Sequence, residues 1–474
     1  FLIVLPPLLF AGGWNTDWYA FKRNLRPISL LSIGLVVLTT VVVAAIAHRL
    51  GGLDWPMSFV LGAIVSPPDA VAAEAVFERM AVPRRIVAVV TGEGLVNDGT
   101  ALVLYRFALA AAVSGAFSLA HAPLQFVIDV VGGVAVGLIV ALLGELVLRA
   151  LLKLEVDDPT ISNVVALIAP YAAYLPADAI GVSGVLAVVT AGIYTSRRSH
   201  LIFSPEARVI SSAVWRVMLL LLNGLVFLAI GLTMPGIVGE IGSIGSFLWV
   251  AAVVFAAMIG LRIAWVYVFA WLPRLIPAIR AADPLPSWRW LIVIGWSGMR
   301  GIVSLAAALG LPYVDGHGHD LHGRAALIFI TICAIVASLL LHGLTLGPLI
   351  AWLGISETHA RQRQEGKIRI AALEEAVRYL HSIEPTLRTA AELEVAGRLR
   401  GEYERRIAHL RGHLDEGETQ SDEQLQNQAD HRISELMLDA ERREIARQRA
   451  AGDIPDDIYR AILYDLDLAG LRLH

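Results

Sequence analysis

Three carboxylic acids lie inside segments that are apolar enough to cross a membrane. Asp69 ends the stretch SPPD at 66–69, and Glu93 and Asp98 belong to the stretch GEGLVND at 92–98. A carboxylate at bilayer depth costs several kcal/mol, so each acid needs either a partner or a task. The residue types favour one task above others, which is to bind an ion.

The prolines before Asp69 predict an interrupted helix with free backbone oxygens. Pro67 and Pro68 lack backbone N–H groups, so the carbonyls four residues before them lose their helical partners. Free carbonyls beside a carboxylate suit a small, hard cation such as sodium or lithium. If Asp98 faces Asp69, the two carboxylates share one cavity and cannot both be ionised cheaply without a cation between them. Cation and proton would then compete for the same oxygens.

The alternative for Asp69 and Asp98 is that each only caps a helix end beside an interruption, since aspartate is a common N-cap residue. An uncharged serine, threonine or asparagine could make the same cap with a smaller desolvation cost. We therefore favour ion binding for both aspartates.

Other polar residues at this depth are expected to be structural. Arg300 lies in a second interrupted segment, SGMRG at 297–301, and a guanidinium there needs a carboxylate. We therefore predict an ion pair between Glu93 and Arg300. Arg262 is expected to extend along its helix to the cytoplasmic interface. The amide of Asn97 is expected to hold the backbone of a broken helix, with direct cation ligation as the alternative.

The elements that carry these residues are membrane spans. Of the 474 residues, 56% are hydrophobic and the mean hydropathy is +0.65, which excludes an ordinary soluble enzyme. A single cysteine, Cys333, excludes an intrachain disulfide. Eleven apolar segments are predicted, at 1–13, 28–48, 55–77, 86–112, 124–148, 160–177, 182–196, 212–234, 246–272, 288–311 and 325–353.

Charge patterning predicts the orientation of these segments. Basic residues concentrate in the loops after the first, third, fifth, seventh and ninth segments, and the remaining loops hold only Arg49 and Arg324. The positive-inside rule then places the first set of loops in the cytoplasm, together with the tail after Trp352. We predict a transmembrane domain at 1–355 and a cytoplasmic helical tail at 356–474. The tail carries apolar residues at helical spacing at 368–383 and 392–414.

The third and tenth segments are interrupted at corresponding positions if 124–148 is a linker helix. Paired interruptions of this kind indicate the binding site of a secondary transporter with inverted repeats. The predicted fold is therefore an all-α polytopic membrane protein with broken crossing helices and a soluble helical tail.

At these residues the chain resembles the monovalent cation:proton antiporter-1 family, the bacterial sodium/proton exchangers related to animal sodium/proton exchangers. Residues 5–10 resemble the family's opening motif L-P-P-L-L-F, and Asp69 matches the aspartate of its broken helix. Residues 92–98 match its signature G-E-S-L-x-N-D, and 298–301 are similar to its G-x-R-G element. The four motifs occur in the right order over residues 1 to about 355, which makes the resemblance specific.

The resemblance implies an electroneutral sodium/proton antiporter with a role in pH homeostasis. Asp69 and Asp98 would bind the cation and the proton, and Asn97 would replace a second aspartate that electrogenic relatives have. Glu93 and Arg300 would form the family's structural ion pair. The family also implies elevator-type alternating access and a homodimer in the bacterial inner membrane. It has thirteen helices, so the eleven segments would be the third to the thirteenth.

Two departures from the family pattern affect the ion site. Gly94 stands where the family usually has a serine, and Pro68 stands where a threonine often precedes the aspartate. A side-chain ligand is therefore missing on each helix, although backbone carbonyls or water could replace it. These departures bear on which cation is preferred.

No cofactor is expected besides the transported ions, Na+ or Li+, or K+, and protons, and no nucleic acid partner is expected. The chain is expected not to be an enzyme. Three alternatives stay open: a potassium/proton exchanger, a non-transporting membrane sensor or regulator on the same scaffold, and an intramembrane hydrolase with Asp69 and Asp98 as an acid/base pair.

Overall fold

The chain is described by a computed structural model that consists of helices and connecting segments. It describes residues 3–114, 122–154, 158–241, 244–277, 283, 285–314, 319, 321–355, 358–415 and 422–451, with 458–459, 462–463, 465–466 and 470. No β-strand occurs in these ranges. The chain divides into two compact units, Phe1–Thr358 and His359–His474. This division lies close to the boundary at 355/356 that composition predicts.

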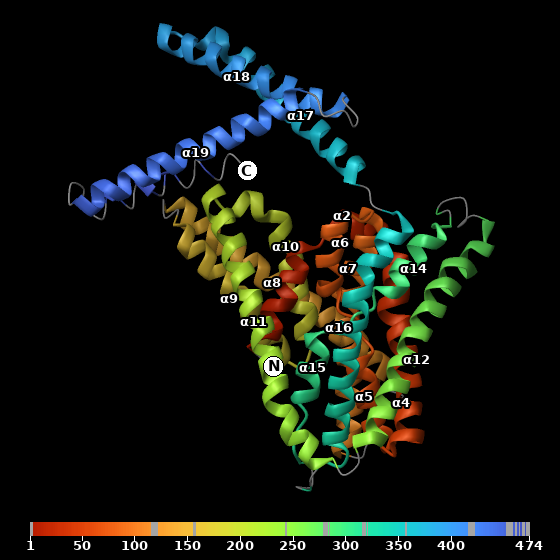
Figure 1. Cartoon of the computed structure of the whole chain (residues 1–474). Helices are drawn as coiled ribbons and strands as arrows, with labels where there is room; N and C mark the ends of the chain where they lie inside the picture. Colours follow the sequence, from red (N-terminus) through yellow and green to blue (C-terminus); the bar gives the residue numbers. More distant parts are fainter. Residues whose placement is uncertain are drawn as a thin grey trace. The chain divides into compact units, whose positions relative to one another are not determined.

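The first unit holds the apolar helices (Figure 1). Its elements are α1 (Leu5–Asn15), α2 (Trp18–Arg23), α3 (Leu25–Ser29), the π-helical turn η1 (Leu30–Leu35), α4 (Val36–Gly51), α5 (Trp55–Val65), α6 (Ala70–Met80), α7 (Arg84–Ser114), α8 (Ala122–Lys153), α9 (Pro159–Ala179), α10 (Gly184–Ile202), α11 (Pro205–Glu240), α12 (Ile244–Trp271), the 3₁₀ turn η2 (Leu272–Leu275), α14 (Trp288–Trp296), α15 (Ile302–Leu309) and α16 (Arg324–Leu353).

Eight helical stretches among the described residues are long and apolar enough to cross a membrane. They coincide with eight of the eleven predicted segments. The other three fall short for separate reasons. The helix α1 has only 11 residues, and segment 288–311 is divided between α14 and α15. The helix α10 ends in a polar stretch that contains Arg197 and Arg198.

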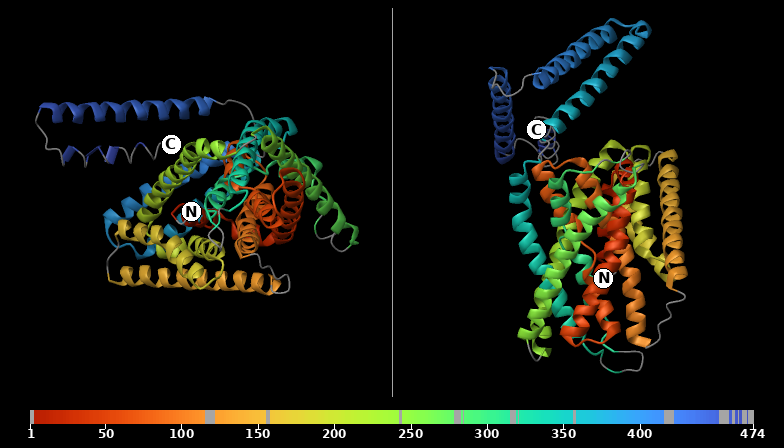
Figure 2. Two further views of the ribbon diagram at one scale, coloured as in Figure 1. Left: turned by 90° about the horizontal axis from the view of Figure 1, so that it is seen from below. Right: turned by 90° about the vertical axis from the view of Figure 1, so that its right-hand side faces the viewer.

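Two groups of helices pack within this unit. The helix α10 contacts α1, α8 and α9, while α4, α5 and α7 pack together and α12 contacts α4, α14 and α16. In Figure 2 the orange and yellow helices α8 to α10 lie on the opposite side from the green helix α12. The helix α11 contacts α9 as well as α15 and α16, so it connects the two groups.

The outer helices present apolar side chains away from the protein core. Leu146 on α8 is 64% exposed and Leu220 on α11 is 71% exposed, and many neighbours on these helices are similar. Such large exposed apolar surfaces would aggregate in water, and they suit contact with lipid hydrocarbon. The cores of the unit lie between the helices, around side chains such as Phe10 and Leu61, which are completely buried.

Two helices are broken and cross each other, as predicted. Residues 66–69 separate α5 from α6, and residues 297–301 separate α14 from α15. Proline prevents continuous helical pairing in the first break, and glycine permits close approach in the second. The two extended stretches are joined directly, because the backbone N–H of Asp69 donates to the carbonyl of Met299 at 2.7 Å.

The second unit is a set of amphipathic helices, α17 (Thr358–Ile383), α18 (Ala390–Asp415) and α19 (Asp422–Ala451), with the 3₁₀ turn η3 (Glu384–Thr386) after α17. The two amphipathic stretches predicted in the tail lie within α17 and α18. A reciprocal cap starts α18, since Thr389 Oγ1 accepts from Glu392 N and Glu392 Oε2 accepts from Thr389 N. The backbone donors of Thr389 and Arg388 also lower the pKa of the Glu392 carboxyl.

Candidate functional site

The crossing point is built around Asp69. Its Oδ1 atom accepts from Val71 N at 2.9 Å, so the carboxylate caps the first turn of α6. A Cβ atom on Gly301 would lie 1.7 Å from Asp69 Oδ2, which means that only glycine leaves room for this carboxylate. The capping role considered for Asp69 is therefore present. The other carboxylate oxygen, Oδ2, lies against the second break.

Asp69 and Asp98 line the same cavity, which has a volume of about 270 Å³. The two carboxylates are close enough to interact electrostatically. Asp98 lies in the interior of α7, so it does not cap a helix end. Apolar side chains from α1, α11 and α16 close the cavity, among them Leu8, Phe227 and Leu339. The capping alternative thus accounts for Asp69 in part and does not account for Asp98.

The hydrogen bond predicted for the Asn97 amide is present. Asn97 is completely buried, and its Nδ2 donates to the carbonyl of Pro68 at 2.7 Å. The amide therefore holds the backbone of the first break one residue before Asp69. The Asn97 Oδ1 atom has no hydrogen-bond partner among the described residues.

The predicted ion pair between Glu93 and Arg300 is wrong, because the partner of Glu93 is Arg262. Arg262 Nη1 donates to Glu93 Oε1 at 2.5 Å and Nη2 donates to Oε2 at 2.8 Å. Glu93 is 1% exposed and Arg262 is 2% exposed, so Arg262 does not extend to an interface. The same guanidinium donates to the carbonyl of Ile294 near the end of α14. A fork of donors can satisfy a carboxylate and a helix end together.

Arg300 instead holds the first broken helix. Its Nη1 donates to the carbonyl of Ser66, which follows the last residue of α5. Its backbone N–H donates to Ser338 Oγ on α16 at 2.9 Å. A cation at the carboxyl end of a helix is favourable because free carbonyls point there. Arg300 is 4% exposed, so this charge is buried at the crossing.

Gly94, the first departure from the family pattern, has a steric reason. A Cβ atom at this position would lie 2.5 Å from Ala70 Cβ, closer than real side chains approach. The glycine therefore lets α7 approach the first residue of α6. Pro68, the second departure, has no side-chain oxygen, and its backbone carbonyl accepts from the Asn97 amide.

The cavity holds a third acid, Glu74, which is not among the site residues predicted from the sequence. Glu74, on α6, lines the same cavity as Asp69 and Asp98, and so does Thr91 on α7. The Thr91 side chain lies close to the Glu74 carboxylate. The sequence could have indicated this residue, since Glu74 lies inside the third apolar segment, where burial of a carboxylate costs free energy. Glu74 and Thr91 lie nearer than Asp69 and Asp98 to the turn that joins α6 and α7, so the cavity extends toward that end.

The wall of this cavity is mostly apolar, and the carboxylates among its polar groups offer oxygen atoms, which suit a hard cation better than a transition metal. In the described part of the chain, no group of three or more His, Cys, Asp or Glu side chains is arranged to hold a metal ion. Oxygen atoms at the crossing come from carboxylates, from the Thr91 hydroxyl and from the backbone of the breaks.

Residues 1–352 match the family model described as "Sodium/hydrogen exchanger, transmembrane". The chain is 32% identical to an uncharacterized Na(+)/H(+) exchanger of Mycobacterium tuberculosis, in an alignment of 481 positions that covers 100% of this chain and 86% of that protein. It is also 33% identical over 359 residues to the "Sodium, potassium, lithium and rubidium/H(+) antiporter" of Bacillus pumilus, covering 74% of this chain and 53% of that protein.

The fold is similar to a solved structure of the sodium proton antiporter MjNhaP1 from Methanocaldococcus jannaschii. The TM-score is 0.57 at 20% sequence identity, over 74% of this chain and 84% of the other. This likeness concerns the arrangement of the helices. Together with the family match over most of the length, it identifies the inverted-repeat fold whose two broken helices cross. The chain therefore belongs to the sodium/hydrogen exchanger family, the monovalent cation:proton antiporter-1 family.

Proposed function

We propose that the protein is an electroneutral sodium/proton antiporter that exchanges one monovalent cation for one proton. The observation that carries this proposal is the shared cavity of Asp69 and Asp98 at the crossing of the broken helices. Two carboxylates in one cavity repel each other unless a cation or a proton lies between them. A cation that binds must therefore release a proton, and a proton that binds must release the cation. No cofactor and no bond-breaking step is needed.

Neutral Asn97 supports the one-for-one ratio. It stands beside Asp98 where a second aspartate would add another titrating carboxylate, and its amide is engaged with the Pro68 carbonyl. A cycle that carries one positive charge each way moves no net charge. We therefore expect the exchange rate not to respond to an imposed membrane potential.

We propose an elevator-type movement between the two helix groups. The broken helices and Asp98 belong to the group that contains α5, α7 and α16, while α1 and α11 supply the opposite wall of the cavity. Movement of the first group along the second would carry the ion site from one side to the other. The family resemblance supports a homodimer in the bacterial inner membrane, and the loop charges support a cytoplasmic tail.

The test is cation-dependent dissipation of a pH gradient in everted membrane vesicles. Wild type is expected to respond to sodium, and Asp98→Asn is expected to abolish the response while the melting temperature stays near the wild-type value. The matched control is Asp54→Asn, since Asp54 is exposed before α5 and makes no side-chain cap. A wild type without any response to sodium, lithium or potassium at any pH would instead favour the non-transporting sensor or regulator.

A second candidate is potassium/proton exchange. The Bacillus pumilus relative carries potassium and rubidium in its name beside sodium and lithium. In this chain, Pro68 and Gly94 also remove two side-chain oxygens from the usual family pattern. Potassium needs longer bonds to oxygen than sodium does. The loss of fixed ligands should therefore weaken sodium binding more than potassium binding. The same vesicle assay with potassium in place of sodium distinguishes the two candidates.

A further inference from the structure

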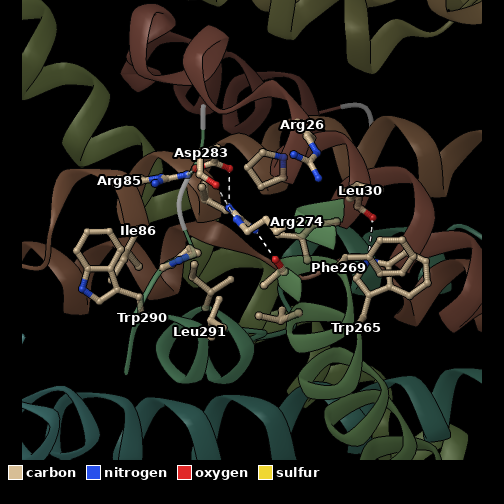
Figure 3. A pocket seen from close by; sticks show the side chains of 17 residues that line it. Arg26, Leu30, Arg85, Ile86, Trp265, Phe269, Arg274, Asp283, Trp290 and Leu291 are labelled. Atoms are coloured by element: carbon tan, nitrogen blue, oxygen red, sulfur yellow. Dashed lines mark hydrogen bonds and ion pairs between the residues drawn. The ribbon is translucent and has the colours of Figure 1, made fainter. Parts of the chain in front are cut away.

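A second cavity lies away from the cation site, between α3, α7, α12 and α14 (Figure 3). Its volume is about 80 Å³. Three arginines line it, Arg26, Arg85 and Arg274, and Asp283 is the acidic residue on its wall. Each arginine lies one residue from the end of a candidate membrane span, those that begin at Leu25 and Arg84 and the one that ends at Leu275. The cavity is therefore at the depth of lipid head groups.

The charges around this cavity leave an excess of positive charge. Asp283 bridges two of the arginines, because its Oδ1 lies 2.6 Å from Arg85 Nη2 and its Oδ2 lies 2.5 Å from Arg274 Nη2. Among the described residues that line the cavity, three guanidinium groups and one carboxylate leave two positive charges without a counter-charge. Arg26 takes no part in the bridge, as Figure 3 shows.

Among these three arginines, Arg26 gives the clearest indication of a ligand. Its Nη2 atom is buried and has no hydrogen-bond partner among the described residues. A buried donor on a charged group that lacks a partner is costly, and such groups usually have an acceptor in the working protein. An anion that enters the cavity would supply this acceptor and would also offset the excess positive charge.

The apolar part of the wall is aromatic. Trp265, Phe269 and Trp290 line the cavity, together with Leu30 and Ile86. The indole N–H of Trp265 is already used, since it donates to the carbonyl of Leu30 in the π-helical turn at 3.1 Å. The Trp265 ring packs against the Phe269 ring, with the two centroids 4.0 Å apart, and this aromatic pair forms an apolar wall of the cavity. Tryptophan at span ends is typical of the membrane interface, where one side of the ring meets acyl chains.

We propose that this cavity binds the phosphate of an anionic phospholipid. Its phosphate oxygens accept hydrogen bonds from Arg26, and its glycerol backbone and first acyl carbons lie against Trp265 and Phe269. Basic pockets between membrane helices recognise such head groups by charge and by donor geometry. The bound lipid links α3 to α7, α12 and α14. Of these, α7 and α12 also carry the Glu93–Arg262 pair.

The test is thermal unfolding of the full-length protein in detergent with three soluble probes. These are dioctanoyl phosphatidylglycerol, dioctanoyl phosphatidylcholine and inorganic phosphate. We expect phosphatidylglycerol to raise the melting temperature at lower concentrations than phosphatidylcholine, and inorganic phosphate at millimolar concentration to have no effect. In Arg26→Gln, the half-saturating phosphatidylglycerol concentration should rise about tenfold, equivalent to about 1.4 kcal/mol.

The matched control is Arg23→Gln, which removes one positive charge from an exposed position at the end of α2. It should bind phosphatidylglycerol as wild type does. Arg26→Gln should also fold normally without lipid, because the Arg26 Nη2 atom has no hydrogen-bond partner among the described residues and the Asp283 bridge joins Arg85 and Arg274 instead. Equal half-saturation in wild type and Arg26→Gln would overturn the proposal. A response to inorganic phosphate that depends on Arg26, with no further gain from phosphatidylglycerol, would show that free phosphate is the ligand and would overturn the lipid assignment.

Discussion

In both broken helices, the backbone carbonyls at the end of the first half lack helical partners, and a different arginine binds them in each. At the first break, the end of α5 is held by Arg300, through the carbonyl of Ser66. At the second break, the end of α14 is held by Arg262, through the carbonyl of Ile294. Each carboxyl end therefore receives a guanidinium, which offsets the partial negative charge of its free carbonyls.

The starts of the second halves differ. The helix α6 begins with the carboxylate cap of Asp69, while α15 begins after Gly301 and has no side-chain cap. Asp69 and Gly301 are in contact, and the missing side chain of Gly301 leaves room for the Asp69 carboxylate. One break thus supplies the negative charge and the other supplies the space for it. The difference teaches that the ion site belongs mainly to the first break, and that the second break supports it.

The largest expected effect comes from the pair that holds the second break. Glu93→Gln leaves Arg262 charged and buried, which should lower the free energy of unfolding by about 3–5 kcal/mol. Denaturation of the purified protein measures this loss. The control Glu78→Gln, at an exposed position on α6, should change stability by less than about 0.5 kcal/mol. The double variant Glu93→Gln/Arg262→Gln should recover part of the loss, because no buried charge remains. Unchanged stability in Glu93→Gln would contradict the structural role.

A smaller effect on stability is expected at the contact between the breaks. Gly301→Ala places a Cβ atom against Asp69 Oδ2, which should cost about 1–3 kcal/mol and displace the carboxylate. Sodium-dependent exchange should therefore be lost, as measured in everted vesicles. The control is Gly260→Ala on α12, where a Cβ atom would meet nothing within 4 Å. Full exchange by Gly301→Ala would mean that the second break does not shape the ion site.

The smallest effect is expected from Glu74, the third acid of the cavity. Glu74→Gln removes a negative charge between the ion site and the α6–α7 turn. The half-saturating sodium concentration should rise by a factor of about 2–5, or about 0.5–1 kcal/mol, without a change in melting temperature. Exchange rates measured over a range of sodium concentrations, with Glu78→Gln as the control, decide this. A half-saturating sodium concentration equal to that of wild type would show that Glu74 does not contribute to cation binding.

Local chemistry was enough to predict both breaks and the amide contact of Asn97. Prolines and glycines within apolar segments interrupt helices wherever those helices pack, so the prediction of the breaks did not depend on tertiary structure. Asn97 needs an acceptor at this depth, and the carbonyls freed by the prolines provide one. The partner of Glu93 did depend on it. Both Arg262 and Arg300 lie at depth, and sequence spacing does not show which of them is opposite Glu93. No break marks the helix of Arg262 as part of the site, so its local sequence does not indicate that it lies opposite Glu93.

The contact between Gly94 and Ala70 also limits how this sequence can change over time. A serine at 94 would supply the hydroxyl common in the family, but its Cβ atom would lie 2.5 Å from that of Ala70. A mutation to serine alone therefore meets a steric penalty before it can improve ion binding. If residue 70 first becomes glycine, this closest contact is removed, and the nearest remaining atom is the backbone nitrogen of residue 70 at 3.2 Å. The family's usual serine is thus accessible mainly when the mutation at residue 70 comes first. A Gly94→Ser variant made alone would underestimate what the serine hydroxyl contributes to ion binding.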